Sequence, residues 1–203
     1  MKSLMEEAHD YFANVEPKKQ AEFKAIRQKA TKGKKWSPLP GPQTEAYKSP
    51  ADEMLYGGQA GPGKTDLLLG LAFEAHITSL IMRRQYTDMG ALTRRAIKIN
   101  GTRDGYSGKM PMALVPQGKP GNLIEFGAAA RLGDEMHWQG QPHDLLGIDE
   151  AVQYLEEQIR LLMGWVRSEI EGQRQRIVLA SNPPIAADGF WIIPMFAPWL
   201  DLT

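Results

Sequence analysis

Cysteine is absent from this chain of 203 residues, and histidine occurs only four times. The absence of cysteine excludes a disulfide framework and any cysteine-ligated zinc or iron–sulfur site. His76, His137 and His143 do not have the spacing of metal ligands, so we interpret them as structural or solvated side chains. A chain without cysteine also fits a reducing compartment such as a cytoplasm.

Long apolar runs and an excess of either charge are missing as well. No stretch of about 18 apolar residues occurs, so we expect no membrane span, and the N-terminus lacks the apolar segment of a secretion signal. The 24 basic and 24 acidic residues cancel to a formal net charge of +0, which gives no global reason to expect a nucleic-acid partner. The length and the 42% hydrophobic content predict one globular domain, with room for an appendage.

The first 35 residues differ in composition from the remainder. Apolar residues at helical spacing predict a helix over residues 1–30, and basic side chains are dense over residues 18–35. We interpret residues 1–35 as a helical basic arm, which is either a solvated helix face or an arm that faces DNA. The remainder divides into a predicted domain over residues 36–190 and a linker over residues 191–203 that leads toward a further domain.

From residue 53 onward, short apolar runs alternate with helical patterns. Strands are expected at 53–58, 79–84, 122–127, 144–150 and 176–182. Helices are expected at 65–76, 87–99 and 152–170, and residues 100–121 are expected to be irregular. Strands that are apolar throughout, alternating with helices, predict an α/β fold with a mainly parallel sheet covered by helices on both faces.

The sequence GQAGPGKT fits the pattern G-x-x-x-x-G-K-[ST] at every fixed position, and its residues are Gly58, Gln59, Ala60, Gly61, Pro62, Gly63, Lys64 and Thr65. Glycines in such a loop let successive backbone N–H groups turn inward around phosphate oxygens. The helix that follows directs the positive end of its dipole to the same place. Lys64 adds a full charge for the β- and γ-phosphates of ATP, and the hydroxyl of Thr65 is a ligand for Mg²⁺. A strand before the loop and a helix after it favour this interpretation over a flexible turn.

Two adjacent carboxylates follow the apolar run LLGI. A buried strand thereby delivers Asp149 and Glu150 at its carboxyl end, which is the edge of an α/β sheet where ligands bind. We predict that Asp149 helps to hold Mg²⁺ and that Glu150 orients and deprotonates an attacking water. An Asp-Glu pair indicates hydrolysis, because a kinase takes its nucleophile from the acceptor substrate.

The last predicted strand ends in Ser181, Asn182 and Pro183. Polar side chains at this strand end could hydrogen-bond the γ-phosphate or the attacking water and report whether the phosphate is present. An ordinary Asn-Pro turn that ends a strand is the alternative.

These motifs together resemble the ATPase domain of a tailed-bacteriophage large terminase subunit. The segments GPQTEAY, LYGGQAGPGKT, WQGQPHDLLGIDEA and ASNPP carry the resemblance, which spans roughly Trp36 to the C-terminus. The resemblance implies a RecA-like P-loop ATPase of the additional-strand class, with a nuclease domain normally downstream. It also implies that Gln43 belongs to an adenine-reading motif and that Ser181, Asn182 and Pro183 form a coupling motif.

The resemblance further implies a molecular motor that hydrolyses ATP to move double-stranded DNA into viral procapsids. Its expected partners are that DNA, a portal protein, a small terminase subunit and further copies of the chain in a ring on the procapsid. Its expected location is the cytoplasm of the infected bacterium. Because the sequence ends before any acidic nuclease cluster, we expect no nuclease activity from these residues.

The sequence departs from the family pattern at its arginines. Many members have an arginine in the phosphate loop or just before the acidic strand, where this chain has Gln59 and Gln139. Arg131, Arg160, Arg167 and Arg174 are candidates for the charge-stabilising arginine, from this chain or from a neighbouring subunit. We favour Arg167, because it follows the helix after Glu150. Arg83 and Arg84, at the end of the second strand, are predicted to contact DNA phosphates, to communicate with the nucleotide, or only to cap a strand at the surface.

Two alternatives to a packaging motor stay open. One is another P-loop DNA-dependent ATPase of the helicase or recombination type, which normally needs a second RecA-like domain or its own arginine motifs. The other is an assembly module that binds nucleotide without turnover in isolation.

Overall fold

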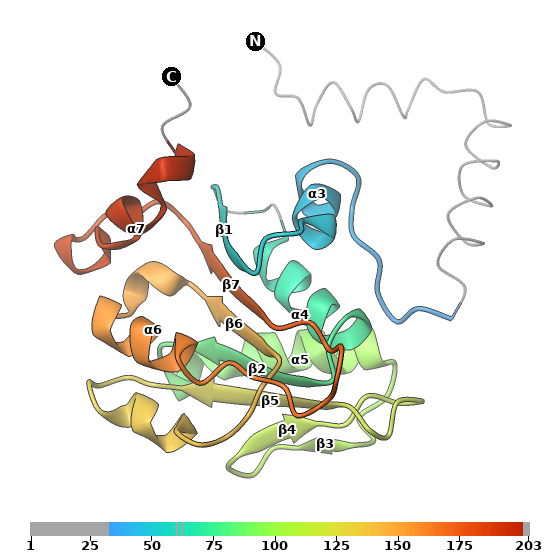
Figure 1. The fold of residues 1–203 in the computed structure, drawn as a ribbon. Coiled ribbons are helices and arrows are strands. Elements are labelled where there is room, and N and C mark those ends of the chain that lie inside the picture. The colour runs from blue at the N-terminus through green and yellow to red at the C-terminus, as the bar shows by residue number, and fades with distance from the viewer. Residues whose placement is uncertain (1–32, 60, 62, 201–203) are drawn as a thin grey trace, which may run out of the picture. The chain divides into compact units, whose positions relative to one another are not determined.

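The computed structural model describes residues 33–59, 61 and 63–200. The chain divides into two compact units, residues 1–37 and 38–203, and the fold below is that of the second unit (Figure 1). The helix predicted over residues 1–30 lies outside the described residues, as does the basic segment up to residue 32. The predicted boundaries between arm, domain and linker therefore stay predictions.

A seven-stranded sheet forms the centre of this unit, in the order β1-β7-β6-β2-β5-β4-β3. Five neighbouring strands are parallel: β1 (Glu53–Gly57), β7 (Arg176–Ser181), β6 (Leu145–Asp149), β2 (Thr78–Arg83) and β5 (Leu123–Ala128). The short strands β4 (Met112–Leu114) and β3 (Tyr106–Ser107) continue the sheet in antiparallel pairing. The predicted α/β fold with a mainly parallel sheet is confirmed.

Strand β7 lies between β1 and β6. The strand that leads into the phosphate loop is thus separated by one strand from the strand that ends in Asp149. This order is the additional-strand arrangement that the resemblance implied, and it brings the carboxyl ends of β1, β7, β6 and β2 to one edge.

Helices cover both faces of the sheet (Figure 1). They are α3 (Pro42–Lys48), α4 (Lys64–Glu74), α5 (Met89–Asn100), α6 (Glu156–Met163) and α7 (Ile192–Leu200). Short 3-10 turns are η1 (Tyr86–Asp88), η2 (Asp134–Trp138), η3 (Ala151–Gln153) and η4 (Ala187–Gly189). Within the described part of the chain, no helix is long and apolar enough to span a membrane.

Helix α4 is buried nearly all round, as its run of leucines predicted. Leu67, Leu68 and Phe73 have no exposed surface. The helix packs closely on β6 because Gly147 of that strand has no side chain. A Cβ on Gly147 would lie 3.3 Å from Leu68 Cδ2 and 2.7 Å from Ile81 Cδ1. Close packing fixes the start of α4 relative to the carboxyl ends of the strands.

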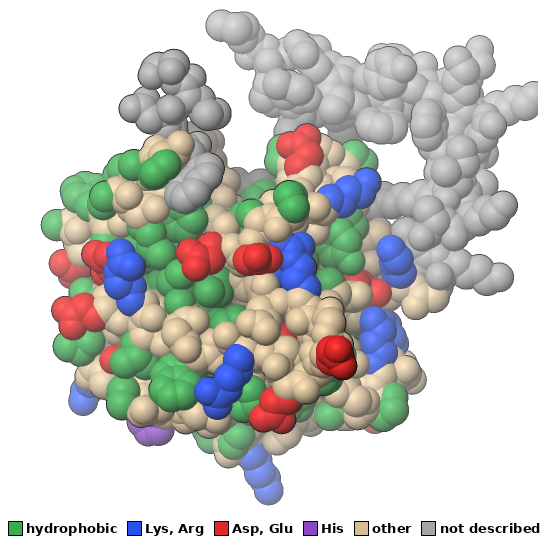
Figure 2. Space-filling model, viewed as in Figure 1, with side chains coloured by type: hydrophobic (Ala, Val, Ile, Leu, Met, Phe, Trp, Pro, Cys, Tyr) green, Lys and Arg blue, Asp and Glu red, His purple; other side chains and the backbone are tan. Residues whose placement is uncertain are grey.

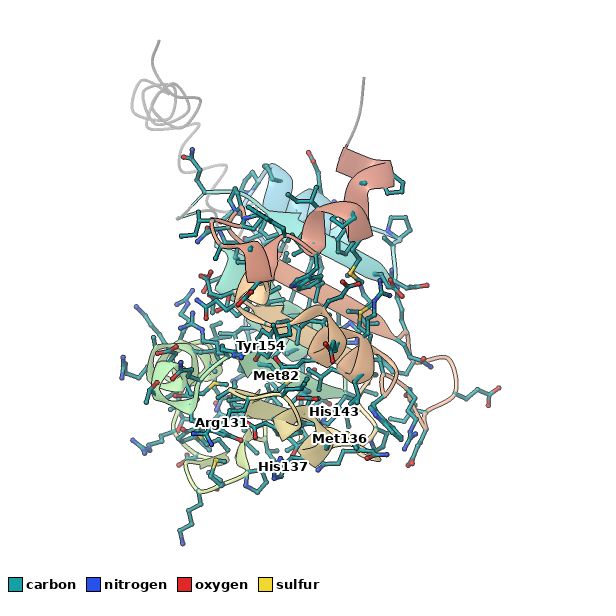
Figure 3. All side chains as sticks on the ribbon, turned by 90° about the vertical axis from the view of Figure 1, so that its left-hand side faces the viewer. Met82, Arg131, Met136, His137, His143 and Tyr154 are labelled. Atoms are coloured by element: carbon teal, nitrogen blue, oxygen red, sulfur yellow. The ribbon has the colours of Figure 1, made fainter. Side chains whose placement is uncertain are left out.

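The opposite face of the sheet carries a second apolar layer. It joins alternate residues of β2, β6 and β7 to side chains from η2, η3, α6 and α7, among them Trp138, Tyr154, Ile159, Trp191 and Phe196. Met82 and Tyr154 lie inside this layer, whereas Arg131, Met136 and His137 are exposed (Figure 3). Residues 191–203, predicted as a linker, thus include α7, whose Ile192 and Phe196 are buried in the core together with Trp191, which precedes the helix.

The long helix predicted over residues 152–170 is wrong in its length. Tyr154 and Leu155 are extended, with ψ angles of 157° and 146°, and α6 is confined to Glu156–Met163 before Gly164. Val166 forms an isolated parallel bridge with His143, and Ile170 is exposed. The apolar spacing therefore comes from consecutive short segments that pack on one sheet face, not from one helix.

The stretch over residues 100–121 is only partly irregular, because it contains β3 and β4. Tyr106 pairs with Leu114, and Met112 with Phe126 of β5. These strands have two and three residues, too few for alternation to be recognised. Basic and acidic side chains are interspersed over the face seen in Figure 2, in keeping with the balanced charge of the sequence.

Candidate functional site

The glycine loop joins β1 to α4, and Gly58, Gln59, Gly61 and Gly63 are its described residues. Ala60 and Pro62 lie outside the described residues. Gly63 is the N-cap of α4 and has a left-handed backbone, with φ of 71°. A side chain there would also meet Gln43, whose Nε2 would lie 2.5 Å from a Cβ. Glycine is therefore required at Gly63 for two separate physical reasons.

Lys64 begins α4 and is buried, with 7% of its surface exposed. Its ammonium group donates to the carbonyl oxygens of Gly58 (2.9 Å) and Gln59 (2.8 Å). It also donates to Asn182 Oδ1 at 2.9 Å, just past the end of β7. All three donors of the ammonium group are thus engaged, and Lys64 ties the loop to the neighbouring strand end.

Asp149 ends β6 and is almost fully buried, with 1% exposure. Its Oδ2 accepts a hydrogen bond from the hydroxyl of Thr65 at 2.9 Å. The same oxygen accepts from Arg83 Nε at 2.9 Å and from Arg83 Nη2 at 2.6 Å. The two predicted metal ligands, Thr65 and Asp149, therefore lie side by side, and an arginine from β2 joins them.

Glu150 follows Asp149 and has a left-handed backbone, with φ of 59° and ψ of 48°. Among the described residues it is the one non-glycine with positive φ. A glutamate in this region carries a conformational cost of roughly 1–3 kcal/mol, which the surrounding structure must sustain. Such strain is common at functional positions, and it turns the chain sharply just where the carboxylate is presented.

These groups surround a cavity of about 310 Å³. The residues that line it are Gly61, Gly63, Lys64, Thr65, Asp66, Asp149, Glu150 and Asn182. Residues up to 121 positions apart in the sequence thus meet at one edge of the sheet. The cavity is thus bordered by the positive end of α4, by one lysine and by the carboxylates of Asp66, Asp149 and Glu150.

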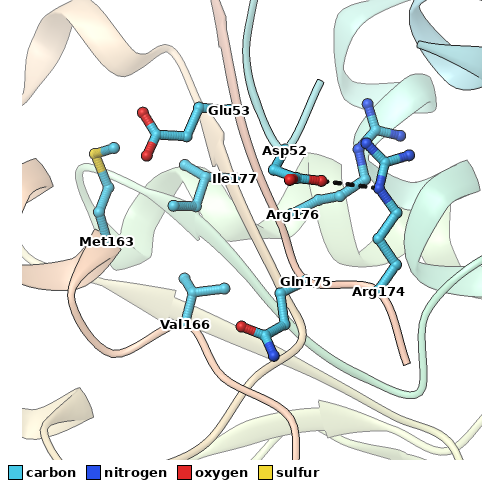
Figure 4. Close-up of a pocket in the computed structure, with 8 residues that line it drawn as sticks. All are labelled: Asp52, Glu53, Met163, Val166, Arg174, Gln175, Arg176 and Ile177. Carbon is cyan, nitrogen blue, oxygen red and sulfur yellow. Dashed lines mark hydrogen bonds and ion pairs between the residues drawn. The ribbon is translucent and has the colours of Figure 1, made fainter. Parts of the chain in front are cut away.

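Two other cavities do not combine these chemical groups. One of about 350 Å³ lies where β1 and β7 begin, beside Asp52, Arg174 and Arg176 (Figure 4). The other, of about 440 Å³, is bordered by Met110, Trp138 and His137. Both are larger than the cavity beside Lys64, so the arrangement of charged groups, not size, identifies the candidate site.

The three predicted coupling residues point to different partners. Ser181 is buried, and its hydroxyl accepts a hydrogen bond from the backbone of Val152 at 3.3 Å. Asn182 bonds to Lys64, while Pro183 is exposed. The strand end therefore connects the phosphate loop with the turn that follows Glu150.

Gln43, which is predicted to recognise adenine, is buried, with 4% of its surface exposed. Its Oε1 accepts from the backbone of Leu39 at 2.6 Å, and its Nε2 donates to the carbonyl of Gly63 at 2.9 Å. The side chain thus links α3 to the phosphate loop. Its predicted contact with a base stays a prediction.

Arg167, the favoured charge-stabilising arginine, does not lie at this cavity. Its backbone N–H bonds to His143 O at 2.9 Å, ahead of the start of β6, and its guanidinium bonds to Gly140 O at 3.1 Å. The distance along β6 from His143 to Asp149 is roughly 20 Å at the usual rise per residue. Arg167 is therefore at the opposite edge of the sheet and does not reach the cavity of its own chain; its action on the cavity of a neighbouring subunit stays a prediction.

The other arginine candidates are also occupied elsewhere or exposed. Arg174 bonds to Asp52 and to backbone carbonyls that precede β1, and Arg160 pairs with Glu156 on the surface of α6. Arg131 is exposed. Instead, Arg83 reaches the site, through a contact that only the adjacency of β2 and β6 creates.

Other polar contacts around the site have no counterpart in the sequence predictions. Arg95 of α5 pairs with Asp66 through two bonds of 2.6 Å. Gln158 is fully buried, accepts from Arg84 at 2.5 Å and donates to Glu135 at 3.0 Å. These contacts join segments far apart in the sequence, so no local pattern could have revealed them.

Two of the histidines are buried beside carboxylates. His76 lies 3.0 Å from Asp144, which also accepts from the backbones of Ile77 and Thr78. His143 lies 2.7 Å from Glu125. Both pairs link the amino ends of strands, where they serve the fold.

Comparison with known proteins reveals similarity at the level of the fold. No protein-family model matches the chain, and no curated protein matches it. The large terminase of bacteriophage HK97 is similar in structure, with a TM-score of 0.56 and 14% sequence identity over 81% of this chain. The large terminase of the thermophilic bacteriophage D6E has a TM-score of 0.44 and 15% identity over 71% of this chain.

The chain spans 38% of the length of each of these two terminases. At such low identity, the likeness to the HK97 protein shows that the two share a fold, an α/β fold with a mainly parallel sheet.

Proposed function

We propose that this chain is the ATPase portion of a viral DNA-packaging motor and hydrolyses ATP at the cavity beside Lys64. The observation that carries the proposal is the convergence of Lys64, Thr65, Asp149, Glu150 and Asn182 around one cavity. The order of the strands and the similarity to the HK97 large terminase support it.

The donor set at the site suits Mg²⁺. Thr65 Oγ1 and Asp149 Oδ2 are 2.9 Å apart, and two adjacent ligands of an octahedral Mg²⁺ are also about 2.9 Å apart, since each lies about 2.0–2.1 Å from the ion. Both are hard oxygen donors of the kind that Mg²⁺ prefers. When bound, the ion would neutralise phosphate charge and orient the γ-phosphate; Thr65 and Asp149 would hold it.

The remaining residues have separate tasks in hydrolysis. The loop N–H groups, the start of α4 and Lys64 bind the phosphates. Glu150 orients a water and accepts its proton as the water oxygen forms a bond to the γ-phosphorus. The bond from that phosphorus to the β,γ-bridging oxygen breaks, and ADP carries away the electron pair.

Phosphate binding must alter the contacts of Lys64, since its three donors are all used by the protein. A phosphate that takes one donor competes with Asn182, which sits just past β7. Through Ser181 and Val152, the same strand end contacts the turn after Glu150. This chain of contacts supports the predicted role of residues 181–183 in coupling.

We further propose that hydrolysis moves double-stranded DNA into a procapsid, with copies of the chain arranged in a ring. A portal protein and a small terminase subunit are the proposed partners, and the cytoplasm of the infected bacterium is the proposed location. Because the chain spans only part of the known terminases, these roles belong to the complete protein.

A second candidate function is nucleotide binding without turnover in isolation. It is favoured by one observation: among the described residues, the arginine that reaches the site, Arg83, is bonded to Asp149, and no arginine side chain borders the cavity itself. If a neighbouring copy supplies that arginine, the single chain binds ATP and awaits assembly.

Glu150→Gln tests the proposal. The substitution keeps the shape of the side chain but removes the proton acceptor, so we expect Mg-ATP to bind with unchanged affinity and phosphate release to fall by roughly 10²-fold or more. Binding is measured with a fluorescent ATP analogue and turnover by phosphate release. Glu157→Gln, at an exposed position of α6, is the control, and turnover that survives in Glu150→Gln refutes the assigned base.

A further inference from the structure

Asp149 Oδ2 is crowded by hydrogen-bond donors. Three reach this one oxygen: the hydroxyl of Thr65 and two nitrogens of Arg83, at 2.9, 2.9 and 2.6 Å. A carboxylate oxygen has two lone pairs, so its capacity is already full. Any cation, or any water on a cation, that approaches this oxygen competes with donors from the protein.

The charge balance explains why Arg83 is there. Asp149 has 1% of its side chain exposed, and a carboxylate so buried is stable only when it is paired. Arg83 supplies a positive charge at the place where the proposed function puts a divalent cation. Without nucleotide, the arginine therefore balances the charge that the metal would otherwise balance.

The surroundings of Arg83 allow it to move. Its side chain is 20% exposed, so it can turn toward solvent without burying an unpaired charge. Its third nitrogen, Nη1, donates to the carbonyl of Asp88 at 3.1 Å, at the N-cap of α5. The neighbouring Arg84 instead bonds to Gln158 and lies over the ring of Tyr154, 5.7 Å from its centroid.

We propose that Arg83 is an internal counter-cation of Asp149 that Mg²⁺ and nucleotide must displace. This inference rests on the proposed function and adds a control step to the same site. Arg83 is a positioning residue: it fixes the carboxylate of Asp149 when no metal is bound, and it raises the Mg²⁺ concentration needed for the metal to bind.

Displacement of Arg83 from Asp149 also affects α5. Two polar contacts link that helix to the site, the Arg83–Asp88 bond at its start and the Arg95–Asp66 pair on its side. Asp66 directly follows Thr65 in the first turn of α4. The buried apolar face of α5 and the Arg95–Asp66 pair stay in place when the first contact is released, so metal binding changes how the start of α5 is held.

Thermal unfolding of the full 203-residue chain with ADP tests the proposal without turnover. The variants are Arg83→Gln and the control Arg174→Gln, which also removes an arginine bound to an aspartate and to carbonyls but lies at the opposite edge. Each is measured with EDTA, with Mg²⁺ alone, with ADP plus EDTA, and with Mg-ADP.

In EDTA we expect Arg83→Gln to unfold roughly 2–8 °C below wild type, since Asp149 loses its partner. We expect Mg-ADP to raise its Tm by more than it raises that of wild type. The Mg²⁺ concentration for half-maximal ADP binding should fall roughly tenfold, because a charged hydrogen bond no longer has to be broken. Arg174→Gln should unfold earlier in every condition but keep the wild-type response to Mg-ADP.

The results separate the two proposals. If wild type gains no stability from Mg-ADP, the proposed function fails. If wild type gains stability but Arg83→Gln gains the same or less, Arg83 is not a competitor of the metal and the counter-cation proposal is refuted. Should Arg83→Gln not fold, Arg83→Lys is measured instead, because lysine keeps the charge but makes fewer contacts with Asp149. The Mg²⁺ concentration that Arg83→Lys needs for half-maximal ADP binding must then fall below that of wild type. An unchanged Mg²⁺ concentration refutes the proposal.

Discussion

Replacing Gly63 by alanine should destabilise the chain more than an ordinary glycine substitution. The backbone of Gly63 is left-handed, a conformation that costs alanine roughly 1–2 kcal/mol. The new Cβ would also lie 2.5 Å from Gln43 Nε2. Gln43 can move only by breaking its bonds to Gly63 O and Leu39 N in a buried setting, which adds roughly 1–3 kcal/mol.

The control is Gly172→Ala, because Gly172 has a similar φ of 75° but nothing within 4 Å of an added Cβ. Gly172→Ala should lose only the conformational part of the free energy of unfolding, roughly 1–2 kcal/mol. Urea unfolding followed by circular dichroism gives both free energies. A double-mutant cycle with Gln43→Ala isolates the collision, because the shorter side chain makes room for the methyl group.

We expect Gly63→Ala to cost roughly 2–5 kcal/mol in the wild-type background and less when Gln43 is alanine, with a coupling of about 1–2 kcal/mol. Equal losses for Gly63→Ala and Gly172→Ala, together with zero coupling to Gln43, would refute the idea that Gln43 braces the phosphate loop. The same cycle measured by nucleotide affinity would show whether that brace also shapes the loop for phosphate.

Three other substitutions or conditions test the packing and ionisation of the core. Gly127→Ala should cost roughly 2–4 kcal/mol in urea unfolding, because its Cβ would lie 2.2 Å from Trp138 Cζ2 on a rigid ring; a loss below that of Gly172→Ala would contradict this packing. Tyr154→Phe should be neutral or stabilising by up to about 1–2 kcal/mol, since the buried hydroxyl of Tyr154 has no hydrogen-bond partner among the residues that the structure describes, and a large destabilisation would contradict that. Burial raises the pKa of Tyr154 and of Tyr56 above that of an exposed tyrosine, so the stability that they contribute is fully present below about pH 10 and is lost as the pH rises above it. Urea midpoints measured at about pH 9 and about pH 11 should fall less for Tyr154→Phe than for wild type, and an equal fall would contradict the assignment.

Much of the candidate site could be predicted from the sequence because parallel strands place their carboxyl ends at one edge. Lys64, Asp149 and Asn182 each follow an apolar run closely, so a local pattern fixes their position in the fold. Their contact then follows from the parallel sheet itself. Neither the motif nor the pattern, however, gives the order of the strands.

The arginines show where this reasoning fails. Arg83 meets Asp149 because β2 lies next to β6, an adjacency between residues 66 positions apart in the sequence. Arg167 follows Glu150 along the chain, which is why the sequence favours it as the charge-stabilising arginine. The chain, however, returns to the amino end of β6 before it reaches Arg167. Closeness to Glu150 in the sequence therefore does not predict closeness to the site in space once the chain has returned to the other edge of the sheet.

The helix predicted over residues 152–170 is wrong for a different reason. Apolar residues at steps of three and four predict the helix, and two of them, Ile159 and Leu162, are buried on one face of the sheet. Burial fixes which side of the sheet these residues face but not the backbone between them. Leu155 satisfies the same spacing with an extended backbone, and its N–H donates to Gln158 Oε1.

The central claim, that this cavity hydrolyses ATP, is tested most directly by phosphate release measured against protein concentration at saturating Mg-ATP. We predict release that Lys64→Ala abolishes, and a rate per chain that rises with concentration if a neighbouring copy supplies an arginine. Release that is unaffected by Lys64→Ala, or no release at any concentration although Mg-ATP binds, would contradict the claim.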